Sequence, residues 1–244
     1  MQPTLYPDLI PSYEHERLEA LQPYQVLGTP GQALFNDFVS VVAKLLDAPI
    51  ALISLVRASD MLFVGNSGLP DATGINREDS MCSIAILNDG LTVFEDLATE
   101  PCALVNPFAA QQMQLAFYVG LPLRAPGGMA IGTLCVLDRR PRRLAEAERA
   151  LLEQLALVAQ DLLQLQVLQA ADQRLAPALR VRFDRPLQNS LSRLTTLAGL
   201  RECDPANPAD SAPDQCYAGS RLEEAKRLVN SLHWELTTAL VDLE

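Results

Sequence analysis

Cysteine and histidine are the side chains best suited to nucleophilic, redox or metal chemistry, and in this chain they are few and scattered. The five cysteines lie far apart, at Cys82, Cys102, Cys135, Cys203 and Cys216. No Cys-x-x-Cys pair occurs, and neither histidine, His15 or His233, lies at a zinc-site spacing from a cysteine. The sequence therefore predicts no metal site and no cofactor, and we expect a reduced, cytoplasmic protein.

Composition argues against two classes of partner. The chain has 244 residues, of which 49% are apolar, and a formal net charge of −11. Nucleic acids and anionic membranes attract clustered lysine and arginine, so we expect neither as a partner. No run of about 20 apolar residues occurs, and the N-terminus lacks the basic start and apolar core of a secretory signal. The apolar content is sufficient for a buried core.

The elements of the first half follow from apolar periodicity and turn residues. Residues 1–13 carry three prolines and are expected to be a tail. The predicted helices span 13–27, 34–46 and 80–87, the last of them capped by Ser80. The predicted strands span 50–56, 60–66 and 91–95, with a loop at 68–79.

A strand pair is predicted over Phe117 to Arg140. Two apolar runs flank Pro126-Gly127-Gly128, and glycine supplies the positive φ that a tight turn requires. We therefore expect this segment to be a β-hairpin.

Residues 144–176 are predicted to form one long helix with a heptad seam. Spacings of three and four residues continue past the seam but change register, as a stutter does. The seam either packs against the sheet of the first half or pairs with a second copy of the chain. We adopt parallel dimerisation, through Leu151, Leu155, Val158, Leu162 and Leu165.

Residues 177–244 are predicted to form a helical hairpin. Apolar stripes indicate helices over 178–200 and from Ser220 to about Leu243, and the proline-rich, acidic segment 202–220 reads as a loop. One such hairpin buries a single face, so we expect two hairpins to make a dimeric four-helix bundle.

Six sequence motifs resemble those of the GAF domain and occur in the same order as in that family, which comprises small sensory modules of bacterial signalling proteins. They are ERLEALQPYQVLGTP, PIALISLV, LFVGNSGL, EDSMCSIAIL, VFEDLATEP and the closing pair VGLPLR with IGTLCVLDRRPR. The resemblance covers Glu14 to Arg143. It implies an α+β fold in which helices flank an antiparallel sheet.

The resemblance also implies a ligand pocket beside the helix that follows the second strand. Its lining would be Phe63, Met81, Cys82, Ile84, Phe117 and Tyr118. Ile84 replaces the histidine of the family's word Ser-Phe-Cys-x-His-x-Ile, which removes a metal or haem ligand. The same residues also fit a plain hydrophobic core, and Cys82 and Cys135 are then small buried apolar residues. The motifs of bilin, cyclic-nucleotide and methionine-sulfoxide-reductase GAF proteins are absent.

The helical hairpin resembles the dimerisation and phosphotransfer hairpin of sensor histidine kinases. Pro186-Leu187 matches the end of the kinase H-box, but Val181 stands at the position of the phosphoacceptor histidine. Valine has no nucleophilic nitrogen, so phosphoryl transfer there is impossible. No nucleotide-binding lid or Asn box follows. His233, in HWELTT, is an alternative phosphoacceptor or else a surface or seam histidine.

These observations predict three regions after the tail: a GAF domain at 14–143, a coiled-coil helix at 144–176 and a degenerate hairpin at 177–244. We expect a non-catalytic signalling protein that forms a homodimer, binds an unidentified small ligand and engages a histidine kinase or response regulator. Two alternatives stay open: phosphotransfer through His233, and a structural dimer whose GAF domain is vestigial.

Overall fold

The computed structural model describes residues 7–27, 33–99, 106, 111, 113–171, 176–199 and 211–241, and all of their side chains except those of 7, 26, 176–184 and 211–220. The chain divides into two compact units. The first comprises Met1–Ser40 with Ala48–Arg143, and the second comprises Val41–Asp47 with Leu144–Glu244.

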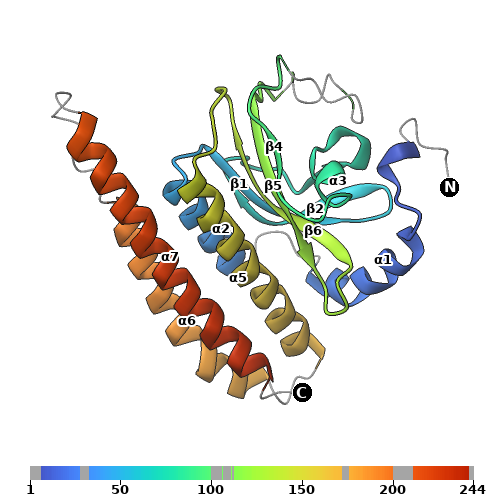
Figure 1. Cartoon of the computed structure of the whole chain (residues 1–244). Helices are drawn as coiled ribbons and strands as arrows, with labels where there is room; N and C mark the ends of the chain where they lie inside the picture. Colours follow the sequence, from blue (N-terminus) through green and yellow to red (C-terminus); the bar gives the residue numbers. More distant parts are fainter. Residues whose placement is uncertain are drawn as a thin grey trace. The chain divides into compact units, whose positions relative to one another are not determined.

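A six-stranded antiparallel sheet forms the centre of the first unit (Figure 1). Its strands are β1 (Ile50–Val56), β2 (Asp60–Ser67), β3 (Gly74–Asn76), β4 (Thr92–Phe94), β5 (Phe117–Arg124) and β6 (Ala130–Asp138). Their order in the sheet is β3-β2-β1-β6-β5-β4. The α+β class, with an antiparallel sheet and flanking helices, is confirmed.

The helices of the first unit are short. They are η1 (Pro7–Leu9), α1 (Glu14–Leu21), η2 (Gln22–Leu27), α2 (Ala33–Leu45, continuing into the second unit), η3 (Arg77–Asp79) and α3 (Cys82–Ala85). The helix predicted over 80–87 is thus shorter than expected, although the Ser80 hydroxyl does accept a hydrogen bond from the Cys82 amide at 3.2 Å. The predicted loop 68–79 contains β3 and η3, which its few apolar residues did not indicate.

The predicted hairpin is the β5–β6 pair. Gly127 and Gly128 have φ angles of 96° and 90°, the left-handed region that the turn was expected to need. Residues 117–124 pair in register with 138–130, apart from one irregularity beside Arg124. The hairpin prediction is therefore confirmed.

Helix α3 and the residues around it cover one face of the sheet. A core cluster there joins side chains of α3 to alternate residues of the strands, including Leu52, Phe63, Tyr118 and Cys135. Phe117 is also fully buried but is not part of this cluster. Successive residues of a strand point to opposite faces, so Phe117 and Tyr118 cannot share one.

Two buried arginines fasten the N-terminal segment to this unit. Arg17 is fully buried and its guanidinium donates to both carboxylate oxygens of Glu14 at 2.8 Å and to the Val56 carbonyl at 2.8 Å. Arg77 also donates to the Glu14 carboxylate and to the Leu9 carbonyl at 2.9 Å. Leu9 is itself buried, so part of the predicted tail belongs to the core.

Three helices make up most of the second unit: α5 (Glu146–Ala171), α6 (Ala176–Gly199) and α7 (Ser211–Val241). Helix α7 packs against both α5 and α6. It begins at Ser211 rather than at the expected Ser220, so the second part of the predicted 202–220 loop is helical. The first part lies outside the described residues.

The apolar stripes of these helices are buried within the single chain. The five predicted seam residues of α5 are between 0% and 2% exposed. The stripe of α7 is also buried, at Ala225, Val229, Leu232, Leu236 and Ala239. Helix α5 packs against α7, so the apolar face of the α6–α7 hairpin is partly buried by a third helix of the same chain. The sequence did not indicate this contact. The dimeric four-helix bundle stays a prediction.

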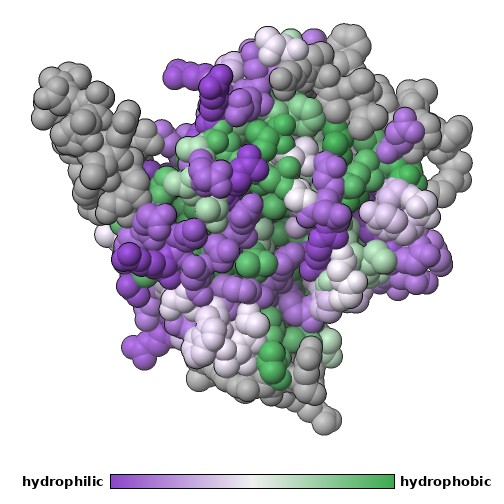
Figure 2. Space-filling view, in the orientation of Figure 1, coloured by the Kyte–Doolittle hydropathy of each residue, from purple (hydrophilic) through white to green (hydrophobic). Residues whose placement is uncertain are grey.

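Hydrophilic residues cover much of the face seen in Figure 2, with hydrophobic residues between them. Among the described residues, no helix is both long enough and apolar enough to cross a bilayer.

Candidate functional site: a sulfur-floored pocket beneath helix α3

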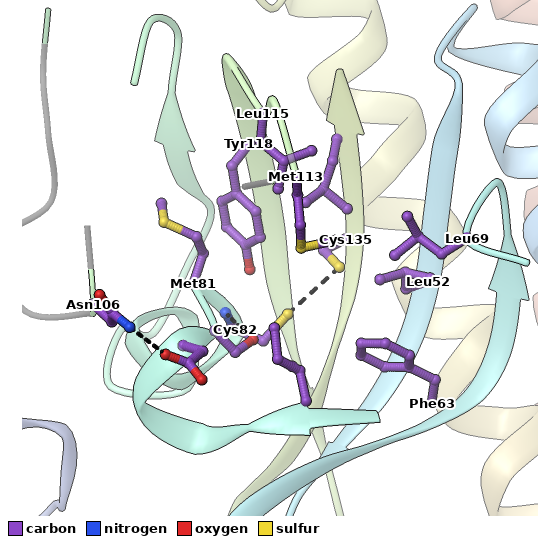
Figure 3. Close-up of a pocket in the computed structure, with 14 residues that line it drawn as sticks. Leu52, Phe63, Leu69, Met81, Cys82, Asn106, Met113, Leu115, Tyr118 and Cys135 are labelled. Atoms are coloured by element: carbon purple, nitrogen blue, oxygen red, sulfur yellow. Dashed lines mark hydrogen bonds between the residues drawn. The ribbon is translucent and has the colours of Figure 1, made fainter. Parts of the chain in front are cut away.

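A mostly apolar pocket lies between α3 and the sheet (Figure 3). The space open to the centre of a water molecule is about 40 Å³, enough for about three waters. The pocket is lined by Leu52, Phe63, Leu69, Ile75, Asp79, Ser80, Met81, Cys82, Asn106, Met113, Leu115, Tyr118, Cys135 and Leu137.

Four of the six residues expected to line a ligand pocket are in this lining: Phe63, Met81, Cys82 and Tyr118. Ile84 belongs to the surrounding core cluster but does not line the pocket. Phe117 is absent from both, and its ring lies 5.4 Å from the Arg142 guanidinium carbon. Strand alternation therefore assigns Tyr118, and not Phe117, to the pocket.

Two thiols meet at the floor of the pocket. Cys82 opens α3 and Cys135 lies in the middle of β6, and their Sγ atoms are 3.5 Å apart. Both thiols are free and buried, at 3% and 0% exposure. Sequence reasoning identified both residues as core but missed their contact, because nothing local relates positions 53 residues apart.

Hydroxyl groups lie beside the thiols. In the β1–β6 register, Leu52 pairs with Cys135 and Ser54 with Thr133. The Ser54 and Thr133 hydroxyls form a buried hydrogen bond of 2.8 Å. A polar patch thus continues from the thiols along the sheet, in an otherwise apolar core.

The Tyr118 hydroxyl is the unusual polar group of the pocket. It is fully buried and has no hydrogen-bond partner among the described residues. The ring lies over Gly120, where an added Cβ would stand 2.2 Å from the phenolic oxygen. Only glycine at that position leaves room for the tyrosine side chain.

The two thiols differ in acidity. The hydrogen bond with Cys135 lowers the pKa of Cys82 to about 6, although burial acts in the opposite direction. The neighbouring Ser54, Thr133 and Tyr118 hydroxyls also lower the pKa of Cys82. The same sulfur–sulfur interaction, together with burial, raises the pKa of Cys135 well above its usual value. Burial and the two sulfurs raise the pKa of Tyr118.

A hydrogen-bonded pair lies at the polar side of the pocket. The Asn106 amide group donates to the Asp79 carboxylate at 2.8 Å, and the Asn106 backbone donates to the Glu78 carbonyl at 2.8 Å. Asn76 donates to the second oxygen of Asp79 at 3.1 Å. These bonds fix the segment that leads into α3.

His233 lies in the second unit, on α7. Its Nδ1 atom is 2.6 Å from the Asp161 carboxylate on α5 and 3.3 Å from the Thr237 hydroxyl. Burial raises the pKa of Asp161, while the His233 ring opposes that shift. Val181 falls within α6, but its side chain is outside the described part of the chain.

A second pocket lies between α6 and α7, at the degenerate H-box. Pro186 is exposed within α6 and Leu187 is buried. Beside them Trp234 is 69% exposed, which is unusual for a large apolar side chain. The pocket offers about 240 Å³ to a water-sized sphere and is lined by Pro186, Leu187, Leu232, Trp234, Glu235, Leu236, Thr238 and Ala239.

The remaining cysteines, Cys102, Cys203 and Cys216, contribute no described side chain. In the part of the chain that the structure describes, no three residues among histidine, cysteine, aspartate and glutamate lie close enough to hold a metal ion.

The chain is similar to a curated bacterial protein over part of its length. Cyclic di-GMP phosphodiesterase PA2567 of Pseudomonas aeruginosa is 33% identical to it over 147 residues. The match covers 60% of this chain and 25% of the relative, so the chain spans a quarter of that protein's length.

Several solved structures are similar in fold. The GAF domain of an Acinetobacter phosphoenolpyruvate-protein phosphotransferase is 14% identical, with a TM-score of 0.45, and covers 61% of this chain and 93% of its own. A domain of a two-component sensor histidine kinase protein from Sinorhizobium meliloti is 18% identical, with a TM-score of 0.40, and covers 51% and 84%.

The model of one protein family matches this sequence. It is the GAF domain, and it covers residues 30–160, more than half of the chain. This match agrees with the antiparallel sheet and its flanking helices. The chain belongs to the GAF-domain family of signalling proteins.

Proposed function

We propose that this protein is a non-catalytic sensor whose pocket beneath α3 binds a small, largely apolar molecule carrying one hydrogen-bond acceptor. The observation that supports this is the Tyr118 hydroxyl, which is fully buried in a mostly apolar pocket. Cys82 and Thr133 lie near it, but it makes no hydrogen bond with the described residues. An unpaired buried hydroxyl costs about 1–3 kcal/mol, and a ligand acceptor would recover part of that cost. The apolar lining suits the rest of such a ligand.

The helices of the second unit are the proposed output. The pocket between α6 and α7, called the groove around Trp234 from here on, supports binding of another protein surface, since an exposed tryptophan beside apolar residues is typical of such surfaces. We assign this surface to a second copy of the chain, with the homodimer then presenting its helices to a histidine kinase or response regulator. The relation to a cyclic di-GMP phosphodiesterase supports a regulatory setting.

Ligand binding is tested by thermal unfolding in the presence of small ketones, with alkanes of the same size as a comparison. A ligand at 100 times its Kd stabilises the folded state by about 2.7 kcal/mol. We expect ketones to raise the Tm more than alkanes do. Tyr118→Phe should remove the difference between the two series, because it removes only the donor.

A matched pair of variants controls for general effects on the fold. Leu69 lines the pocket and Val93 does not, and both are partly buried. Leu69→Trp should fill the pocket and abolish the ketone effect, while Val93→Trp should keep it. Equal stabilisation of both variants would rule out this pocket. No stabilisation by any compound would favour the structural dimer with a vestigial GAF domain.

Phosphotransfer through His233 is the second candidate, supported by the Asp161 carboxylate 2.6 Å from Nδ1. A carboxylate that accepts the Nδ1 proton leaves the Nε2 lone pair available as a nucleophile. Incubation with a phosphorylated response regulator, or with a kinase and ATP, should then give an acid-labile phosphate. Its absence from the wild type, or its persistence in His233→Gln, would remove this candidate.

A further inference from the structure

The two thiols at the pocket floor are placed to react with each other. Cys82 Sγ and Cys135 Sγ are 3.5 Å apart, while a disulfide requires about 2.05 Å, so a closure of about 1.5 Å suffices. Cys135 lies on a central strand that pairs with Leu52 on one side and Gly120 on the other. Helix α3 has only four residues, so it is the element that would move.

We propose that Cys82 and Cys135 are a peroxide-reactive dithiol that forms a reversible intramolecular disulfide. The site is assigned by the sulfur–sulfur contact together with the pocket that reaches both sulfurs. It goes beyond the proposed ligand binding, because it depends only on these two side chains and on access to them.

Access is provided by the pocket. Both cysteines line it, although each is almost completely buried from bulk solvent. Its space accommodates about three waters, and hydrogen peroxide is only slightly larger than water. The apolar lining would exclude charged oxidants and bulky thiols. A small neutral peroxide is therefore the class of oxidant that this pocket admits.

The environment divides the roles between the two sulfurs. Hydrogen bonding with Cys135 favours the thiolate of Cys82, and the thiolate is the nucleophilic form. Cys135 retains its proton, as its raised pKa indicates. Cys82 is thus the attacking sulfur and Cys135 the resolving sulfur. The contacts of Ser54 and Thr133 keep hydroxyl groups next to this pair.

The reaction balances with peroxide as the oxidant. The Cys82 thiolate attacks one oxygen of hydrogen peroxide, forming an S–O bond and breaking the O–O bond with release of hydroxide. Cys135 sulfur then attacks the sulfenic sulfur, which forms the S–S bond and breaks the S–O bond, and the expelled oxygen takes the Cys135 proton and leaves as water. The hydroxide of the first step takes up the proton that Cys82 lost on ionising and becomes the second water. Two thiols lose two electrons, and peroxide becomes two waters. A dithiol reductant reverses the step.

The test uses the full chain with Cys102, Cys203 and Cys216 replaced by serine, so that only the proposed pair remains. After treatment with hydrogen peroxide, unfolding and alkylation, we expect intact mass spectrometry to show the loss of two hydrogen atoms and no alkylation. Peptide mapping should recover a Cys82–Cys135 link, and dithiothreitol should restore two alkylatable thiols.

Single variants in this background separate the roles. With Cys135→Ala, oxidation should stop at a sulfenic acid on Cys82 that dimedone captures. With Cys82→Ala, the remaining thiol should react at least about tenfold more slowly. Circular dichroism checks that each variant is folded. Two thiols that stay fully alkylatable in the folded parent, under conditions that oxidise an exposed cysteine, would overturn the proposal. So would sulfenic acids without a cross-link.

Discussion

At the scale of single residues, the carboxylate of Glu14 holds two buried guanidinium groups. Arg17 and Arg77 are 0% and 4% exposed, and both donate to it. Burial raises the pKa of Glu14, but the hydrogen bonds and charges of the two arginines outweigh it, and the net shift is downward. Glu14 is therefore ionised in the folded protein at pH values where the unfolded chain already binds a proton.

We expect Glu14→Gln to destabilise the first unit by about 3–5 kcal/mol at neutral pH, because it leaves two buried cations without a counter-charge. Urea unfolding measures the loss. The Glu14 contribution is present above the unfolded pKa of about 4.5 and disappears as the pH falls through the lower folded value. The difference between wild type and variant should therefore shrink in acid. Glu19→Gln, at an exposed position on the same helix, should change stability by less than about 0.5 kcal/mol.

The contact of Gly120 with Tyr118 gives a second prediction at this scale. An added methyl group would lie 2.2 Å from the phenolic oxygen of a fully buried ring. Gly120→Ala should cost about 1–3 kcal/mol, as overpacking does. Combining it with Tyr118→Phe should recover part of the loss in a thermal melt, because the nearest atom is removed. A double variant no more stable than Gly120→Ala would show that the phenolic oxygen is not the obstacle.

At the scale of elements, a partly buried contact between a carboxylate and an imidazole joins α5 to α7. Asp161 and His233 side chains are 13% and 30% exposed, and their contacting atoms are 2.6 Å apart. Burial raises the pKa of Asp161, which means that its charged form is tolerated mainly because of the histidine.

His233→Ala should destabilise the second unit by about 2–3 kcal/mol at pH 7, since it leaves a buried carboxylate unpaired. An acid with a raised folded pKa is more stable protonated, so the loss should decrease as the pH falls through that value and Asp161 takes up its proton. Adding Asp161→Asn should restore most of the stability at pH 7, measured by urea unfolding. As a control, Arg227→Ala breaks the exposed pair with Glu224 and should have little effect.

Elements with strong periodicity were predictable from the sequence, and their partners were not. The β5–β6 hairpin was predictable because a tight turn needs residues with positive φ, and Gly127 and Gly128 supply them between two apolar runs. The start of α7 at Ser211 was missed because prolines and acidic residues around it favour a loop. The Cys82–Cys135 and Glu14–Arg77 contacts join positions 53 and 63 residues apart, and only the packing of helices α3, α1 and η3 in the folded unit brings them together. Four of the six residues expected at a ligand pocket line the pocket beneath α3; that expectation came from the family resemblance and not from periodicity, and ligand binding there stays a prediction.

At the scale of the whole molecule, the chain passes between the two units at three points: within α2, after Asp47 and after Arg143. Helix α2 runs from the first unit into the second, and residues 139–145 connect β6 to α5. The connection from β6 to α5 is short, and β6 itself carries Cys135. Along the chain, Cys135 is thus separated from the start of α5 only by the end of β6 and by residues 139–145.

Self-association through the groove around Trp234 gives a prediction at this scale. We expect the wild type to be a dimer by light scattering at micromolar concentration, and Trp234→Ala to shift it toward monomer while keeping its circular dichroism. Val241→Ala removes another exposed apolar side chain, 65% exposed and outside the groove, and should remain dimeric. A wild type that is monomeric would contradict both the groove and the predicted dimeric bundle.

The strand order also has a consequence for how the chain is made. β1 and β6 are neighbours at the centre of the sheet, although the strands β2 to β5 lie between them in sequence. A nascent chain that ends before Ala130 therefore has two separate half-sheets, β3-β2-β1 and β5-β4, each with an unpaired edge. The domain can close only after β6 leaves the ribosome. Fragments cut before that strand should be captured by chaperones or aggregate, whereas those cut after Asp138 can complete their sheet.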